Sequence, residues 1–227
     1  MSELPPAAAP TSAQPRLAET FDEVEDALLS RWPETRMEPS LDRIRAFTEL
    51  LGDPQRAYPV IHLTGTNGKT STARMIDTLL RAIELRTGRF TSPHVERMNE
   101  RISLDGEPLT DEQFVTAFND VAPYIDLVDA QQPHPLSFFE TVVAMAYAAF
   151  ADAPVDVAVV EVGLGGTWDA TNVADAAVAA VSRIFLDDGA RVCLYTDQAN
   201  PTSNGVYVAL GYRPVVDQVN LRIGGGS

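Results

Sequence analysis

The chain has 227 residues, of which 45% are hydrophobic, so it is long enough to fold around a sizeable core. Its 32 acidic and 17 basic residues give a formal net charge of -15, which argues against a nucleic-acid groove and against binding to an anionic membrane surface. Cys193 is the only cysteine, which excludes an intrachain disulfide. No stretch reaches the ~20 apolar residues of a membrane span and no signal-peptide pattern is present, so we expect a cytoplasmic protein.

The first part of the chain contains a tail and two amphipathic segments. Residues 1–16 are rich in Pro and Ala, a composition typical of a disordered tail. Apolar residues at helical spacing then predict two helices, one carrying Leu17, Phe21, Val24 and Leu28 and the other carrying Leu41, Ile44, Phe47 and Leu51. Ser40 is expected to cap the second helix.

A glycine-rich segment follows the apolar run 59–63, which predicts a strand. A strand that leads through such a turn into a helix directs backbone N–H groups at one point, where the helix dipole also favours an anion. Lys69, the only lysine of the chain, would supply a charge for the β- and γ-phosphates, and Thr70 or Ser71 would supply a hydroxyl for Mg²⁺. The sequence therefore predicts a nucleotide site, the alternative being a tight turn whose lysine arose by chance. The predicted residues are Gly65, Thr66, Asn67, Gly68, Lys69, Thr70 and Ser71.

The middle of the chain alternates between helix and strand patterns. A helix with a wide apolar face is predicted from Met75, Ile76, Leu79, Leu80 and Ile83. Residues 89–91 begin a short strand, and the alternating segment 102–106 ends in Asp-Gly, which predicts a hairpin. Two helices are expected to begin with capping boxes, formed by Thr110 with Gln113 and by Ser137 with Glu140.

Residues 155–162 form a nearly continuous apolar run with one acid, Glu161. This pattern is typical of a strand buried on both faces in a parallel sheet. Gly163 to Gly166 follow, and a further apolar run spans 176–181. The alternation predicts an α/β fold with a doubly wound, mostly parallel sheet and flanking helices in a domain at 17–182. Residues 183–223 predict a small β-α-β unit, and 224–227 are linker-like.

Four motifs in order along the chain carry a resemblance to a known family. They are the T-G-T-N-G-K-T loop at 64–70, the segment 91–102 beginning Thr-Ser-Pro-His, Ser137 to Glu140, and Glu161 to Asn172. Over about residues 36–182 the chain resembles the front part of the ATPase domain of folylpolyglutamate and dihydrofolate synthases, in the Mur ligase superfamily. The resemblance implies an ATP-dependent ligase that joins glutamate to a folate or pteroate carboxylate through an acyl phosphate. ATP and Mg²⁺ would be its cofactors, and folate or dihydropteroate and L-glutamate its substrates.

The same resemblance implies roles for individual residues. Lys69 and Glu161 would be catalytic, and Ser92, Glu161 and Thr70 would hold Mg²⁺. Glu161 could instead be a strand-end acid facing solvent, and Ser92 before Pro93 could be only part of a turn. The implied pterin and folate site consists of Ser40, Leu41, Asp42, Arg43, Ser137, Phe138, Phe139, Glu140, Trp168, Asp169 and Ala170.

Several of these side chains have a second interpretation. Phe138, Phe139 and Trp168 could equally belong to the core. His62, inside a strand, is expected to be structural. His94 and His134 lack metal-ligand spacing and are expected to be hydrogen-bonded loop residues.

The chain also departs from the family. No histidine follows His134 and no lysine follows Lys69, so the family's second metal-binding histidine and its carbamylated lysine have no counterpart. Residues 192–215 instead resemble the last β-α-β of a GNAT-type N-acetyltransferase, in which Asn204 would contact acetyl-CoA and Tyr207 would act as the general acid. The glycine-rich loop of that family is absent. Three hypotheses remain: a ligase fragment whose missing lobe a second chain could supply, a nucleotide-binding protein without ligase activity, and an acetyltransferase module or inactive fusion.

Overall fold

The computed structural model describes residues 17–33, 40–64, 68–163, 165 and 168–174. The chain divides into two units, Met1–Val181 and Ser182–Ser227, and every described residue belongs to the first. Several predictions lie outside the described residues and stay predictions. They concern the tail at 1–16, Gly65, Thr66 and Asn67 of the phosphate loop, the apolar run 176–181, and the acetyltransferase-like segment with Asn204 and Tyr207.

Among the described residues, five strands form one sheet in the order β1-β5-β2-β3-β4. Its parallel part consists of β1 (Val60–Leu63), β5 (Val157–Glu161) and β2 (Thr87–Phe90), with β5 in the middle. The remaining strands, β3 (Ile102–Leu104) and β4 (Glu107–Pro108), extend the sheet as an antiparallel hairpin. Every residue of β5 is buried, which confirms the strand expected from the uninterrupted apolar run.

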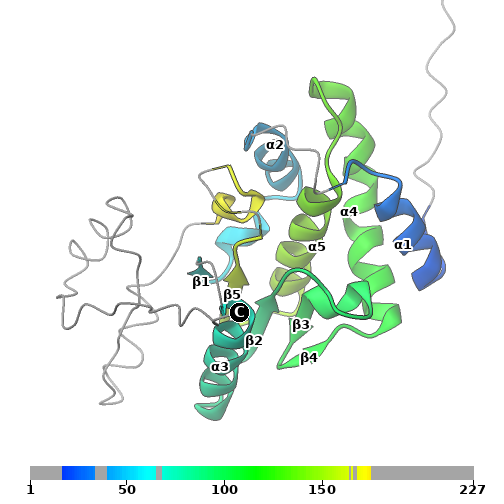
Figure 1. Ribbon diagram of the computed structural model, residues 1–227. Helices are drawn as coiled ribbons and strands as arrows, with labels where there is room; N and C mark the ends of the chain where they lie inside the picture. The colour runs from blue at the N-terminus through cyan, green and yellow to red at the C-terminus, as the bar shows by residue number, and fades with distance from the viewer. Residues whose placement is uncertain (1–16, 34–39, 65–67, 164, 166–167, 175–227) are drawn as a thin grey trace, which may run out of the picture. The chain divides into compact units, whose positions relative to one another are not determined.

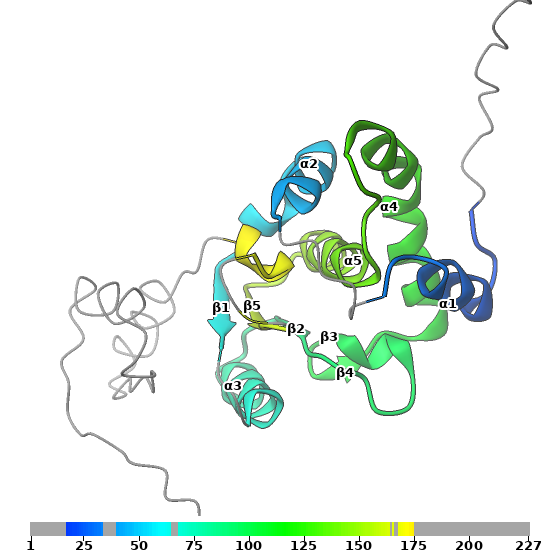
Figure 2. The same ribbon diagram turned by 45° about the horizontal axis from the view of Figure 1, so that its top comes forward.

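Helices lie on both faces of this sheet (Figures 1 and 2). Helix α3 (Lys69–Ala82) covers one face, and α5 (Phe138–Asp152) packs on the other. Three further helices surround α5, namely α1 (Phe21–Leu29), α2 (Asp42–Leu50) and α4 (Asp111–Gln131). The expected α/β class, with flanking helices and parallel central strands, is confirmed. Short 3₁₀ turns span Pro54–Arg56 (η1), Met98–Arg101 (η2) and Ala170–Val173 (η3).

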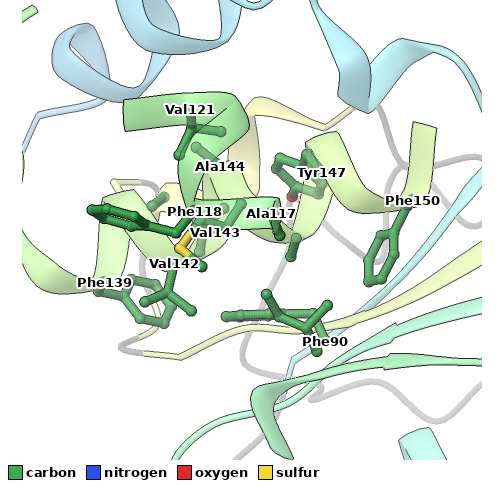
Figure 3. Packing of buried hydrophobic residues seen from close by; sticks show 14 of the residues in the cluster. Phe90, Ala117, Phe118, Val121, Phe139, Val142, Val143, Ala144, Tyr147 and Phe150 are labelled. Atoms are coloured by element: carbon green, nitrogen blue, oxygen red, sulfur yellow. The ribbon is translucent and has the colours of Figure 1, made fainter. Parts of the chain in front are cut away.

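Helix α5 forms the centre of the core, because its side chains are apolar and buried on nearly all sides. Figure 3 shows Phe90 of β2 below the α5 side chains, and the ring centroids of Phe90 and Phe139 lie 5.9 Å apart. Gly88, also on β2, allows this close packing. A Cβ atom placed there would lie 2.6 Å from the ring of Phe150, so only glycine lets α5 approach the strand.

Local sequence signals determine several element boundaries. Thr110 and Gln113 form the predicted capping box of α4, and Ser137 and Glu140 form that of α5. Each pairs a side chain with the backbone N–H of the other residue, which satisfies two donors that the helix leaves without partners. The predicted hairpin turn is also present, with positive φ at Asp105 and Gly106.

Two helix starts differ from the predictions. Helix α1 begins at Phe21 because the Thr20 side chain accepts from the Glu23 N–H, so Leu17 precedes the helix and is 55% exposed. In α2 the capping position is Leu41, which already has helical dihedral angles. Ser40 lies one residue earlier, where its hydroxyl accepts from the N–H of Asp42 at 3.0 Å.

The apolar face predicted for α3 is only partly covered by described residues. The helix packs on the sheet through Ala73, Asp77 and Leu80, which are buried. Met75 and Leu79 lie on another side of the helix and are 65% and 60% exposed. The predicted helix is therefore present, but its buried face is narrower than the apolar spacing suggested.

Candidate nucleotide-binding site

The described members of the predicted phosphate and metal set lie at one edge of the sheet. The three parallel strands run in the same direction, so β1, β5 and β2 end together at this edge. Leu63, the last residue of β1, is paired with Glu161, the last residue of β5. Helix α3 begins at Lys69, shortly after β1, and Ser92 lies two residues beyond β2. Ligands of α/β proteins bind outside such carboxyl ends.

Glu161 is the centre of the site. Its side chain is 2% exposed, and both of its oxygens lie within hydrogen-bonding distance of the Thr70 hydroxyl, at 2.9 and 3.2 Å. The ammonium nitrogen of Lys69 lies 3.9 Å from Oε1. On the other side, the backbone N–H of Ser92 donates to Oε2 at 3.4 Å. Glu161 is thus a buried acid with polar neighbours from two other elements, and it does not face open solvent.

These groups fit a magnesium ion. Mg²⁺ prefers hard oxygen ligands and is commonly held by one or two carboxylates together with waters and substrate phosphates. Glu161 offers a carboxylate and Thr70 a hydroxyl beside it, while Ser92 reaches the same carboxylate through its backbone N–H. In the described part of the chain, no three His, Cys, Asp or Glu side chains gather as an all-protein metal cage would require. Ser71 is exposed, so this geometry favours Thr70 over Ser71 as the hydroxyl beside the metal.

The start of α3 is suited to an anion. Gly68 occupies the N-cap position with φ of 75°, a left-handed conformation that glycine adopts without strain. No side chain among the described residues caps the helix there, so its first N–H groups are available to an anion. The 14-residue helix and the Lys69 ammonium together place positive potential at this edge of the sheet.

Two segments predicted to bind folate pack against each other. The Nε of Arg43 lies 3.1 Å from both carboxylate oxygens of Glu140, and both side chains are buried. This ion pair joins the start of α2 to the start of α5. Glu140 also accepts from the N–H of Ser137, so its carboxylate already has two protein partners.

Core packing is the interpretation that the structure favours for the two phenylalanines. Phe138 and Phe139 are 6% and 3% exposed. The guanidinium of Arg101 lies 4.9 Å from the ring centroid of Phe138, a cation–π contact. The ring of Phe139 fills the space beside Gly163, where a Cβ atom would lie 2.3 Å away. By contrast Trp168 is 49% exposed and remains accessible to a ligand.

Asp169 is buried and holds its own surroundings together. One oxygen, Oδ1, accepts from both the N–H and the hydroxyl of Thr171, at 3.0 and 2.6 Å. The other, Oδ2, accepts from the N–H of Gly165 at 3.1 Å. Thr171 was not singled out from the sequence as a site residue. The signal for it was the D-A-T-N motif itself, in which an acid two residues before a threonine can form a local hydrogen-bonded turn.

Of the two loop histidines, His94 has the hydrogen bond that was expected, and His134 has an aromatic contact. His94 accepts at Nδ1 from the Nε of Arg101, 2.9 Å away. The ring of His134 lies against that of Trp32, with centroids 5.0 Å apart. Neither belongs to a metal-ligating group among the residues described.

Comparison with known proteins places this arrangement in context. No family model matches the chain. The chain is 55% identical over 172 residues to the dihydrofolate synthase/folylpolyglutamate synthase of Mycobacterium tuberculosis, an alignment that covers 73% of this chain and 35% of that protein. The structure of the Mycobacterium tuberculosis folylpolyglutamate synthase with ADP and AMPPCP has a TM-score of 0.64 at 54% identity, covering 69% of this chain and 34% of that one. The described unit therefore resembles the N-terminal region of folylpolyglutamate/dihydrofolate synthases.

Two solved synthases carry further ligands. A folylpolyglutamate synthase complex with AMPPCP and folate has a TM-score of 0.64 at 39% identity, over 69% of this chain and 38% of that one. A bifunctional folylpolyglutamate synthase/dihydrofolate synthase with Mn, AMPPNP and L-glutamate has a TM-score of 0.61 at 29% identity, over 72% and 38%. The present chain spans about a third of the length of these synthases. No helix in its described ranges is both long and apolar enough to cross a membrane.

Proposed function

We propose that this chain carries the Mg-nucleotide-binding part of an ATP-dependent ligase of the folylpolyglutamate/dihydrofolate synthase type. The observation that carries the proposal is the convergence on the buried Glu161 carboxylate of the Thr70 hydroxyl, the Lys69 ammonium and the Ser92 backbone. Lys69 and Thr70 are the first residues of α3, which follows β1, and Ser92 lies in the loop that follows β2. The complexes of the synthases with adenine nucleotides support this assignment.

Each residue has a distinct part in the proposed site. Lys69 and the N–H groups at the start of α3 would hold the β- and γ-phosphates, because a compact ammonium and a helix N-terminus both stabilise clustered negative charge. Glu161, Thr70 and Ser92 would hold Mg²⁺, which supplies neutralisation of phosphate charge during phosphoryl transfer. Burial of Glu161 keeps its carboxylate in one orientation, so that the metal and the phosphates share a defined position.

The reaction assigned by this proposal is ligation. A carboxylate of folate or dihydropteroate would attack the γ-phosphate to form an acyl phosphate, releasing ADP, and the amine of L-glutamate would then displace phosphate to form an amide. The half-exposed Trp168 is the aromatic side chain of the predicted substrate set that remains available for stacking on a flat ring. Since no lysine follows Lys69 and no histidine follows His134, we limit the proposal for this chain alone to nucleotide binding.

The experiment is a calorimetric titration of the full chain with Mg-AMPPCP. Lys69→Ala is expected to weaken binding about 10- to 100-fold, because a charge-assisted hydrogen bond contributes about 1.5–3 kcal/mol. The matched control is Arg74→Ala, which removes an exposed cation from the same helix and should leave the affinity nearly unchanged. Absence of Mg-AMPPCP binding by the folded wild-type chain would overturn the proposal. The acetyltransferase-like function of residues 183–223 and a second chain that completes the ligase stay predictions.

A further inference from the structure

A partly buried chain of hydrogen bonds joins strand β1 to the segment that follows β5. The Nε2 atom of His62, on β1, lies 2.7 Å from the hydroxyl oxygen of Thr171. That hydroxyl donates to Oδ1 of Asp169 at 2.6 Å. The opposite oxygen of Asp169 accepts from the N–H of Gly165, four residues after Glu161.

The direction of these bonds follows from the available protons. A threonine hydroxyl has one proton, and Thr171 gives it to the carboxylate, which as an ionised group can only accept. The oxygen of Thr171 must therefore accept from His62, so Nε2 carries the proton of the neutral ring. Burial lowers the pKa of His62, although the negative charge of Asp169 acts in the other direction, and the ring is therefore neutral near pH 7.

The turn held by this network leaves β5 directly after Glu161. Gly165 has φ of 82°, a conformation that glycine adopts without strain, and its N–H is held by the Asp169 carboxylate. Phe139 packs against Gly163, and Asp169 accepts from the N–H of Gly165. At the same time His62 precedes Leu63, the residue paired with Glu161. The network thus connects the strand that enters the phosphate loop with the strand that carries the acidic side chain.

We propose that His62 is a positioning residue of the Mg-nucleotide site, acting through Thr171 and Asp169 on the turn after Glu161. This inference rests on the nucleotide-binding function proposed above. Loss of the donor would break the link between β1 and the Thr171–Asp169 pair, leaving Thr171 held by Asp169 and the Tyr147 hydroxyl, and would loosen the exit of β5. Because Glu161 would hold the metal whereas Lys69 and the start of α3 would hold the phosphates, the metal-dependent part of nucleotide binding should be affected most.

The test compares AMPPCP binding by the full chain in excess Mg²⁺ and in EDTA. Thr171→Val, which keeps the shape but removes the hydroxyl, and His62→Phe, which removes the donor, should each weaken binding in Mg²⁺ by roughly tenfold. Binding in EDTA should change by less than about twofold. Thr171→Ser, which restores the hydroxyl, should recover the wild-type response to Mg²⁺. The matched control is Tyr58→Phe, because its buried hydroxyl donates to the carbonyl of Tyr147 and does not touch Thr171.

The outcomes separate this inference from the function on which it rests. Failure of the wild type to bind Mg-AMPPCP would overturn the proposed function and the role of His62 with it. Wild-type binding with an unchanged Mg²⁺ response in folded Thr171→Val and His62→Phe would overturn only the role of His62. An equal loss of AMPPCP affinity in Mg²⁺ and in EDTA, or the same loss in Tyr58→Phe, would overturn the role of His62. The network would then only stabilise the fold. If neither Thr171→Val nor His62→Phe folds, as judged by circular dichroism, Asp169→Asn carries the same test.

Discussion

The hydroxyl of Thr70 lies 2.9 Å from Oε2 of Glu161, although the two residues are 91 positions apart. This contact joins the first turn of α3 to the end of β5, and so it connects the part of the site proposed to bind phosphate with its acidic part. Thr70 can serve both sides, because a hydroxyl donates one proton and accepts at its lone pairs. The hydroxyl is thus placed where a metal ion between phosphate and carboxylate would need a ligand.

This contact predicts a difference between two neighbouring hydroxyls. Thr70→Val should weaken Mg-AMPPCP binding roughly tenfold, since it removes an oxygen beside the metal position while preserving the shape of the side chain. Ser71→Ala should change it by less than about twofold, because Ser71 is exposed. Titration of both variants with Mg-AMPPCP checks the prediction. A larger loss in Ser71→Ala would show that the helix start presents Ser71 to the metal instead.

The packing of Phe139 on Gly163 predicts a stability defect. Gly163→Ala should lower the free energy of unfolding by about 1–3 kcal/mol, because its Cβ would lie 2.3 Å from the Phe139 ring in a filled core. Urea denaturation gives this value. Combining it with Phe139→Leu should cost less than the sum of the two single changes, since the smaller side chain vacates the space. Additive losses would mean that the clash is relieved by backbone movement.

The buried pair of Arg43 and Glu140 predicts a second, larger defect. Arg43→Met should destabilise the fold by about 3–5 kcal/mol, because it leaves the Glu140 carboxylate buried without its cationic partner. Arg43→Met combined with Glu140→Gln should lose less than the sum of the two single variants. Thermal and urea denaturation of the four proteins of this cycle measure the coupling. A coupling near zero would place the effect of Arg43 in its packing alone.

Burial of His62 predicts how stability depends on pH. Its folded-state pKa lies below the value of about 6.5 in an unfolded chain, so the unfolded state binds more protons between these two values. The free energy of unfolding should therefore rise with pH across this range, and its contribution from His62 should be lost as the pH falls below about 6.5. His62→Asn should show a shallower fall in stability between pH 7 and pH 5 than wild type.

Much of the fold was predictable from local patterns in the sequence. Hydrophobic spacing identified the helices, the apolar run before Gly163 identified the buried β5, and the capping boxes located the starts of α4 and α5. These signals work because helix period, strand burial and capping each involve residues a few positions apart. Where the prediction failed, a residue outside the apolar pattern decided, as with Thr20, which caps α1 so that the helix begins at Phe21 and leaves Leu17 outside it.

The sequence by itself determined the parts of the site, namely a strand, a glycine-rich turn and a helix beginning at the only lysine. The resemblance of later motifs to a ligase family identified Ser92 and Glu161 as partners. The tertiary structure decided which side chains meet. Strand order brings Thr70 to Glu161 across 91 positions and His62 to Thr171 across 109, and it turns Phe138 and Phe139 into the core. Such contacts depend on how β5 inserts between β1 and β2, which is set by the packing of the whole sheet and by no local period.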